Sequence, residues 1–400
     1  MSFQYAQRGS LSIWLVPLML ALLIMLVGVL QHGQMQRQSW TRQITVDHLA
    51  LSAGVLLARE MNILAMTNRA LLANQLVVSQ LIGIASWFEM LRTSTTRTAT
   101  ISAWVPGLNA VTRQIALIVR QSQQPVEQLV RAGIIMQKAI TTALSSMQTL
   151  VRASFAVMIP ATLTDIAKLH TSEPFEFDIL HSPTLLPFPL LWWSFIRPRH
   201  TGNDDSALLT RMQASMDPFS QHRTYSWFDF FALKIIKTGG TEVTVDKRGR
   251  WHWQGLDTLS LHLRAFWSWQ ELPWGEGARQ QQRIDKVERD AFGKSRHYNP
   301  RAVSWALSTQ RTIQSGQRIY YFDRPQLATE KAPSVFVRSG SAVAKAGIRF
   351  YRPQSLFARS DNRLEKANLF NPFWEGQLQS LTQLDRQLLL RQDALEDNQR

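Results

Sequence analysis

The sequence has no cysteine, and its acidic residues are outnumbered by basic ones. Its 400 residues contain 29 Asp and Glu against 44 Lys and Arg, a formal net charge of +15. The absence of cysteine excludes a disulfide framework, a Cys-ligated zinc or iron–sulfur centre and a cysteine nucleophile. The apolar share of 45% excludes an acidic disordered chain and suffices for at least one core. The positive balance favours anionic partners such as nucleic acid, phospholipid or acidic glycan.

The sequence also lacks the short motifs of common catalytic sites. GxxxxGK[ST], GxGxxG, GxSxG and HExxH are all absent. The carboxylates of Asp285 and Glu288 are explained more simply by ion pairing on a wet helix face. His252 and His262 lack a third ligand at a fixed spacing. We therefore predict a protein that is not an enzyme and has no catalytic residues, no metal site and no cofactor.

One long uncharged run occupies Leu11–Leu30. Its twenty residues would span about 30 Å as a helix, which is the thickness of a bilayer core. A cleaved signal peptide has a shorter apolar run and a small-residue cleavage site, and neither is found here. We predict a short tail over 1–10 and one retained transmembrane helix over 11–30. Charge alone leaves the orientation open, since Arg8 precedes the run and Arg37 and Arg42 follow it.

Residues 36–160 are predicted to form a long helical hairpin. No proline occurs between Ile44 and Arg92, and apolar residues there recur at helical spacing. A second helical pattern follows Pro106-Gly107, from about 108 to 158, and Pro160 is expected to end it. Apolar stripes of this kind are typical of two antiparallel helices packed as a coiled coil.

The pattern changes after residue 160. Residues 161–222 are predicted as a Pro-rich irregular linker, and 223–366 as a basic, Trp-rich β domain. Strands are expected at 241–245 and 250–254 as a hairpin, then at 259–264, 318–322, 334–337, 342–346 and 349–351. Residues 276–291 are predicted as a charged helix or loop, and 367–400 as a C-terminal helical tail. The fold class is therefore α+β, with a transmembrane helix that continues into a helical hairpin and a mainly antiparallel β domain.

Tryptophan and arginine alternate within the predicted β domain. Trp251 and Trp253, together with Arg248, Arg250 and Arg264, have the composition of a surface that stacks bases or sugars. Burial of alternate Trp residues in a sheet core, with Arg on the wet face, explains the same alternation more simply.

Three segments together resemble a known family. Residues 7–10 read QRGS directly before the apolar run, residues 47–54 and 58–75 read DHLALSAG and AREMNILAMTNRALLANQ, and residues 369–378 read LFNPFWEGQL. The chain resembles the TadE/TadG-like proteins of the tight-adherence (Flp) pilus assembly system, in particular TadG-like members. The resemblance covers well under half of the chain. Pseudopilin relatives carry a glutamate five residues after the processing glycine, where this chain has Trp14, so prepilin-type cleavage is not expected.

The resemblance implies a non-enzymatic, single-pass protein of the bacterial inner membrane with a cytoplasmic tail over 1–10 and a periplasmic C-terminal bulk. Its expected partners are other pilus assembly or pseudopilin proteins, with oligomerisation allowed. We expect the polar contacts within or between helices to come from Arg59, Asn62, Asn68, Arg69 and Asn74, because a buried amide without a partner costs about 1–3 kcal/mol.

Two other functions stay open at this stage. The basic block over 234–366, with 24 basic and 12 acidic residues, fits a membrane-anchored binder of an anionic polymer such as DNA, lipopolysaccharide or acidic glycan. An envelope hydrolase is the lesser alternative, because catalytic residues can assemble from distant positions.

Overall fold

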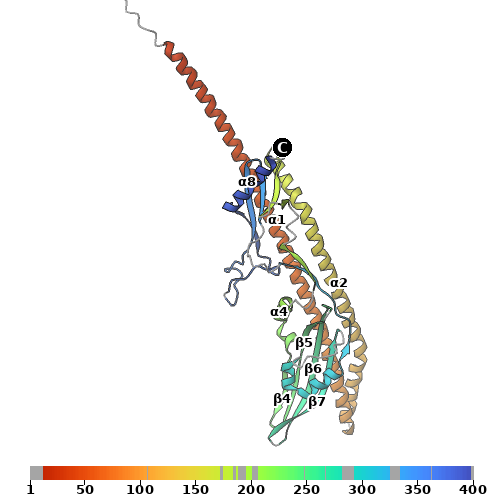
Figure 1. The fold of residues 1–400 in the computed structure, drawn as a ribbon. Helices are drawn as coiled ribbons and strands as arrows, with labels where there is room; N and C mark the ends of the chain where they lie inside the picture. The colour runs from red at the N-terminus through yellow and green to blue at the C-terminus, as the bar shows by residue number, and fades with distance from the viewer. Residues whose placement is uncertain are drawn as a thin grey trace, which may run out of the picture.

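Figure 1 shows a computed structural model of the chain, which describes residues 12–105, 107–171, 174–182, 186–187, 195–200, 206–246, 248–265, 267–281, 292–324, 334–361 and 363–397. The fold is α+β, with a long N-terminal apolar helix, a second long helix and mostly antiparallel sheets. The tail predicted over 1–10 lies outside the described residues.

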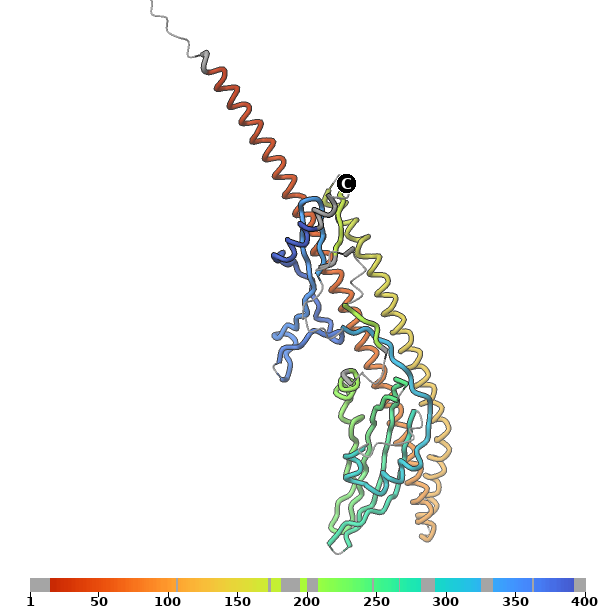
Figure 2. Tube along the Cα trace, viewed as in Figure 1, coloured from red at the N-terminus to blue at the C-terminus, as the bar shows by residue number. Residues whose placement is uncertain are grey.

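Helix α1 (Ser12–Ile101) is 90 residues long and continues without a break through Gly33. Its large apolar side chains from Leu15 to Leu30 are exposed, and continuous burial against the rest of the chain begins only near Thr45. By length and composition, the first part of α1 is apolar enough to cross a membrane, and no part of that stretch is buried. Figure 2 shows this part of the helix projecting alone from one end of the molecule.

Helix α2 (Leu108–His170) follows the short helix η1 (Ser102–Trp104) and runs antiparallel along α1. Ser102 contacts Thr112 next to the connection, and His48 contacts His170 at the far end. The predicted end at Pro160 is wrong, because α2 continues through this proline to His170. The hydrogen bond that proline removes is offset by the buried side chains around it, which pack against α1.

The proximal sheet lies nearer to the N-terminal part of α1 and has the strand order β12-β11-β10-β1-β2, all antiparallel. Its apolar face packs on residues 46–64 of α1 and on the C-terminal part of α2. The backbones of Gly54 and Gly376 touch, since a Cβ on Gly376 would lie 2.4 Å from the carbonyl carbon of Gly54. Its strands are β1 (Asp178–Ser182), β2 (Leu186–Pro187), β10 (Ser334–Ser339), β11 (Ala342–Phe350) and β12 (Trp374–Gln379).

This sheet corrects two predicted boundaries. The stretch predicted as a linker over 161–222 holds the end of α2, the strands β1, β2 and β3 (Arg197–His200), and the helices α4 (Ser206–Ser215) and α5 (Pro218–Gln221). The predicted helical tail begins with strand β12, and helix α8 (Gln383–Asp397) starts only afterwards. Strand β3 pairs with β9 (Tyr320–Asp323) as a separate ribbon.

The distal sheet has the order β4-β5-β6-β7-β8 and lies near the connection between α1 and α2 (Figure 1). The predicted hairpin is confirmed, since Val245 pairs with Trp251 and the ladder continues to Leu233 and Leu263. The expected helix or loop over 276–291 is wrong in its first residues, which belong to strand β7, and 282–291 lie outside the described residues. The strands are β4 (Tyr225–Phe230), β5 (Leu233–Val245), β6 (Trp251–Ala265), β7 (Ser268–Gln280) and β8 (Arg311–Thr312).

The distal sheet packs one face on α1, and helices α6 (Gly293–Tyr298) and α7 (Pro300–Ser308) add a small core with Leu256 and Ala278. Glycine lets the sheet approach the helix closely. A Cβ on Gly277 would lie 2.1 Å from the carbonyl oxygen of Ser86, so this position admits no side chain without movement of the backbone.

Candidate functional site: the polar seam and exposed stripes of the two long helices

Two predicted asparagines fasten the C-terminal segment to α1. Asn62 donates to the carbonyl oxygen of Trp374 at 2.9 Å and accepts from its backbone N–H at 2.9 Å. Asn68, which is 1% exposed, donates to the carbonyl oxygens of Phe322 and Leu369, both at 2.7 Å. The second and third segments of the family resemblance therefore contact one another across about 300 residues of sequence separation.

Asn74 makes the predicted contact between the two helices. Its side-chain amide donates to the carbonyl oxygen of Gln137 at 2.7 Å and to the hydroxyl of Thr141 at 2.6 Å. Gln148 of α2 donates in turn to Thr67 and to the side-chain oxygen of Asn68. Buried amides thus set the register of α1 against α2, because each loses a partner if one helix slides.

A buried ion pair joins the helices about two turns before Thr67, and the sequence did not indicate it. The carboxylate of Glu60 accepts from the guanidinium of Arg152, with side chains 1% and 3% exposed. Residues 92 apart in sequence give no local signal of such a pair. The one available hint is Glu60 itself, an acid inside a run of apolar residues.

Arg59 and Arg69 differ from the asparagines. Both are exposed, and neither forms a hydrogen bond or an ion pair with any part of the chain that the structure describes. They therefore make none of the polar contacts among the described residues, because they lie on the side of α1 that faces away from α2 and the sheets. That they contact the helix of a partner stays a prediction.

Arg59 and Arg69 belong to an exposed stripe of α1, which we call the α1 stripe. Its other large members are apolar and between 37% and 60% exposed. The positions recur at intervals of three, four, seven and eight residues, so they share one face of the helix. The α1 stripe comprises Leu51, Val55, Arg59, Met66, Arg69, Val77, Ile84 and Trp87.

Helix α2 carries a comparable face, the α2 stripe. Its members are all apolar, are 38–73% exposed, and recur at intervals of three, four and seven residues. An apolar heptad seam buries itself against a further helix when one is present. The α2 stripe comprises Leu129, Met136, Ile140, Met147, Leu150 and Val157.

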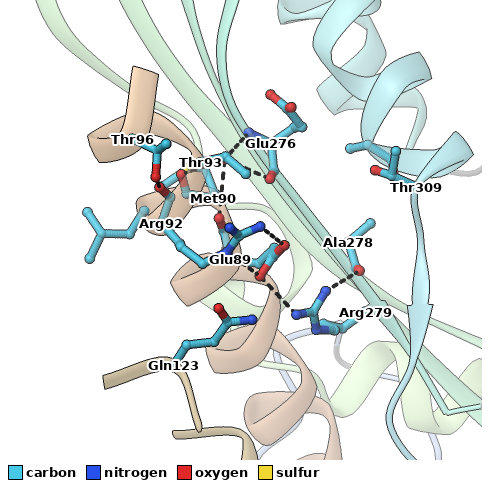
Figure 3. Close-up of polar contacts among 12 residues, drawn as sticks. Glu89, Met90, Arg92, Thr93, Thr96, Gln123, Glu276, Ala278, Arg279 and Thr309 are labelled. Carbon is cyan, nitrogen blue, oxygen red and sulfur yellow. Dashed lines mark hydrogen bonds and ion pairs between the residues drawn. The ribbon is translucent and has the colours of Figure 1, made fainter. Parts of the chain in front are cut away.

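A network of ion pairs joins the end of α1 to strand β7 (Figure 3). Glu89 accepts from Arg92 at 2.7 Å and from Arg279 at 2.9 Å, and Arg279 also reaches Glu127 of α2. Thr93 both donates to and accepts from the backbone of Glu276 at 2.9 Å.

These contacts hold the carboxylate of Glu89 as an anion. Burial alone would raise the pKa of Glu89, but the hydrogen bond from Arg92 and the charge of Arg279 outweigh it, so the pKa is lowered. Arg97 likewise makes a bidentate pair with the carboxylate of Glu276, at 2.7 and 2.6 Å. The ion pairs of Glu89 and Glu276 therefore fasten β7 to the helices.

A second buried network lies within the distal sheet. The carboxylate of Asp257 accepts from Arg223 at 2.8 Å, from Lys237 at 2.6 Å and from Ser86 of α1 at 2.7 Å. Burial lowers the pKa of Lys237, against the attraction of Asp257. Two cations that share one buried anion make Asp257 indispensable to this packing.

The predicted aromatic–basic surface does not exist as one surface. Trp251 and Trp253 are 1% and 0% exposed, inside the core formed with α1 and α2, as pleated alternation requires. Arg250 pairs with Asp246 beside the β5–β6 turn, whereas Arg264 lies at the opposite end of β6. Of the five residues, Arg248 and Arg264 are exposed.

The two histidines considered for metal binding do not meet. His252 contacts Asp246 at 3.1 Å, and burial lowers the pKa of His252 despite that neighbour. His262 contacts the side-chain oxygen of Asn299 at 3.0 Å. Among the residues that the structure describes, no group of three or more His, Asp and Glu could hold a metal ion.

An open groove of about 540 Å³ lies between α2 and the β3–β9 ribbon. Hydroxyls of Thr142, Ser146 and Thr149 line one wall, and Arg318 and Tyr320 line the other. Arg318 is an exposed cation of this wall, and its guanidinium donates to the backbone carbonyl oxygen of Arg248 at 2.8 Å.

Comparison with known proteins gives no relative. No protein-family model, no curated protein and no solved structure matches this chain.

Proposed function

We propose that the chain is a non-enzymatic, membrane-anchored component of a tight-adherence pilus assembly or secretion apparatus, acting through helix packing with partner subunits. The observation that carries the proposal is helix α1. Its exposed apolar first part and its buried later part form one continuous helix, so a membrane span would be rigidly joined to the folded body. The resemblance of residues 58–75 and 369–378 to TadG-like proteins supports the pilus assignment, and the N-terminus is then cytoplasmic and the folded body periplasmic.

Helix α2 also contains a stretch apolar enough to cross a membrane, but part of that stretch is buried. Its hydrogen bonds to Asn74 and Thr67 fix it against the folded part of α1. The apolar surface of α2 therefore serves partner helices in our proposal, and α1 alone anchors the chain.

In this proposal, the α1 stripe and the α2 stripe bind the partner subunits. The α1 stripe carries Arg59 and Arg69 and no acidic residue, so it suits an amphipathic partner helix with carboxylates ten residues apart. The buried asparagines serve the fold of the chain itself.

The experiment is co-purification of pilus components with the tagged full chain from the membrane fraction. Arg59→Glu combined with Arg69→Glu should abolish co-purification and piliation without loss of the folded chain, because both side chains are exposed. Arg363→Glu, at an exposed position outside the stripes, is the matched control. Asn68→Leu combined with Arg69→Ala should also impair co-purification, but with reduced protease resistance, since Asn68 supports the fold. Unchanged co-purification and piliation in the Arg59/Arg69 variant would contradict the proposed role.

The anchor is tested separately with a C-terminal reporter and alkaline extraction of membranes. We expect periplasmic reporter activity and a chain that alkali does not release. Release of the chain from membranes by alkali would refute the anchor, whatever the result of the co-purification experiment.

A second candidate function is the binding of an anionic polymer, which the groove lined by Arg318 favours, with the exposed Arg248 joined to Arg318 through its backbone. The full chain should then be retained on immobilised heparin in a salt-dependent way. Arg248→Gln combined with Arg318→Gln should elute at lower salt, and equal elution would dispose of this candidate.

A further inference from the structure

The distal sheet ends in a concentration of exposed aromatic side chains. The β4–β5 connection and the β6–β7 connection lie side by side, because Leu233 of β5 pairs with Leu263 of β6. Exposure rises to 81% at Phe231 and 99% at Trp267. We call this group the aromatic tip: Trp227, Phe228, Phe230, Phe231, Trp267 and Trp269.

The aromatic tip lies at the far end of the molecule from the projecting part of α1 (Figure 1). Strand β7 begins at the tip with Ser268 and then passes the end of α1, where Trp274 donates to the hydroxyl of Thr98. Trp104, at the connection between α1 and α2, is 90% exposed at the same end. A soluble monomer rarely leaves this much apolar surface uncovered, so the tip is expected to have an occupant.

The shape of the tip favours a lipid surface over a protein. The side chains project from turns and from an edge strand that is exposed along its whole length, not from a groove or a helix face. Trp and Phe on protruding turns suit the boundary between headgroups and acyl chains, where their rings bury without a shaped cavity.

The charges beside the tip agree with anionic headgroups. The ammonium of Lys234 lies 5.0 Å from the ring centre of Trp269, and the guanidinium of Arg264 lies 5.7 Å from that of Phe231. Asp229 is the neighbouring carboxylate, and Lys234 neutralises it at 3.0 Å. Arg264 therefore remains as a cation at the level of the aromatic rings.

We propose that the aromatic tip inserts into the headgroup region of a lipid bilayer that contains anionic lipids. This geometry rests on one part of the proposed function, which is that α1 is the anchor at the opposite end. The bilayer at the tip is then a second membrane surface. The chain then acts as a spacer of fixed length between two membranes.

The absence of cysteine supplies a clean probe for the test. Ser268→Cys, an exposed position between the two exposed tryptophans, gives the full chain a single thiol for a polarity-sensitive fluorophore. The labelled full chain in nanodiscs is mixed with vesicles of phosphatidylcholine, with or without phosphatidylglycerol. We expect a blue shift on addition of vesicles that is larger with phosphatidylglycerol, and none for a label at Ser360→Cys, which lies elsewhere on the surface.

Variants then assign the binding to the tip. Phe231→Ser combined with Trp267→Ser should lower the apparent vesicle affinity about tenfold or more, because two large apolar side chains leave the bilayer. Arg264→Gln should remove the preference for phosphatidylglycerol, and Leu364→Ser, at a position 89% exposed outside the tip, should change nothing.

The absence of a blue shift with either lipid composition would overturn the proposal. Equal vesicle affinity of the wild type and the Phe231/Trp267 variant would do the same. Either result would favour a protein as the occupant of the tip. Failure of the anchor would instead appear as release of the chain by alkali. The label at position 268 reports on the tip in either case, so the two failures are distinguishable.

Discussion

The proximal and distal sheets both pack on α1, but they do so through different chemistry. The proximal contact is an apolar core around Leu57 and Trp374, with Asn62 bonded to the backbone of Trp374. The distal contact buries small polar and charged groups of α1, among them Ser86 and Glu89, against glycines and ion pairs of the sheet. The contact of α1 with the first sheet is thus mainly apolar, whereas its contact with the second sheet combines an apolar core around Trp253 with buried polar and charged groups.

The chemical difference between the two contacts predicts that they differ in their tolerance to amino-acid substitutions. An apolar contact loses free energy in proportion to the area removed, and it accepts substitutions of similar size. A buried charge network fails when one member is lost, because its partners remain buried without compensation. The distal half should therefore be the more easily broken part, and the following substitutions test that comparison.

The largest effect is expected from Asp257→Asn. The substitution leaves Arg223 and Lys237 buried without their shared anion, which should cost about 3–5 kcal/mol of unfolding free energy. Limited proteolysis of the purified full chain should show new cleavage in the distal sheet while the proximal sheet stays resistant. Asp361→Asn, in an exposed pair with Arg359, is the control and should leave the pattern unchanged. A wild-type pattern for Asp257→Asn would show that the network does not hold the sheet.

Asn68→Leu tests the proximal side and should have a smaller effect. It leaves the carbonyl oxygens of Phe322 and Leu369 without this donor, at about 1–3 kcal/mol for each group that water cannot reach. The thermal midpoint of the purified chain measures the loss. Arg69→Leu, on the exposed stripe one residue further on, should stay within about 0.5 kcal/mol of wild type. Equal midpoints for the two variants would contradict the role of Asn68.

Gly277→Ala probes the close approach of the distal sheet to α1. The added Cβ would meet the carbonyl oxygen of Ser86 at 2.1 Å, and overpacking of this kind costs about 1–3 kcal/mol. Gly33→Ala, where no atom lies within 4 Å, should be neutral or stabilise the helix by about 0.5–1 kcal/mol. Gly277→Ala should lower the thermal midpoint and Gly33→Ala should not, and a midpoint for Gly277→Ala at or above that of wild type would argue against tight packing at Gly277.

Local patterns predicted much of this fold, and long-range pairing explains what they missed. Both long helices and the β5–β6 hairpin follow from periodicity within one stretch of sequence. Strand β1, by contrast, pairs with β10 more than 150 residues later, which no local pattern indicates. Strand β12 lies in the stretch predicted as a helical tail, because the spacing of Leu378 and Leu381 favours a helix, whereas pairing with β11 sets the conformation of this strand.

The same distinction applies to the candidate site. Asn62, Asn68 and Asn74 were identifiable because an amide on an apolar helix needs a partner. The pair of Glu60 with Arg152 was missed because its two members are distant in sequence. For the tryptophans, alternation along a strand is the signal that indicates burial. Trp251 and Trp253 alternate in β6, and both are buried.

The smallest expected effect concerns pH. Because the folded pKa of Glu89 is lowered from its ordinary value of 4.5, its contribution to stability is fully present above that value and is lost as pH falls through the folded pKa. Glu89→Gln removes this contribution, so the difference in thermal midpoint between wild type and variant should be constant near neutral pH and shrink below about pH 4.5. Asp165→Asn, in an exposed pair with Lys168, should show only a small difference at any pH. A difference that stays constant into acid would mean that the distal contact depends on the shape of Glu89 and not on its charge.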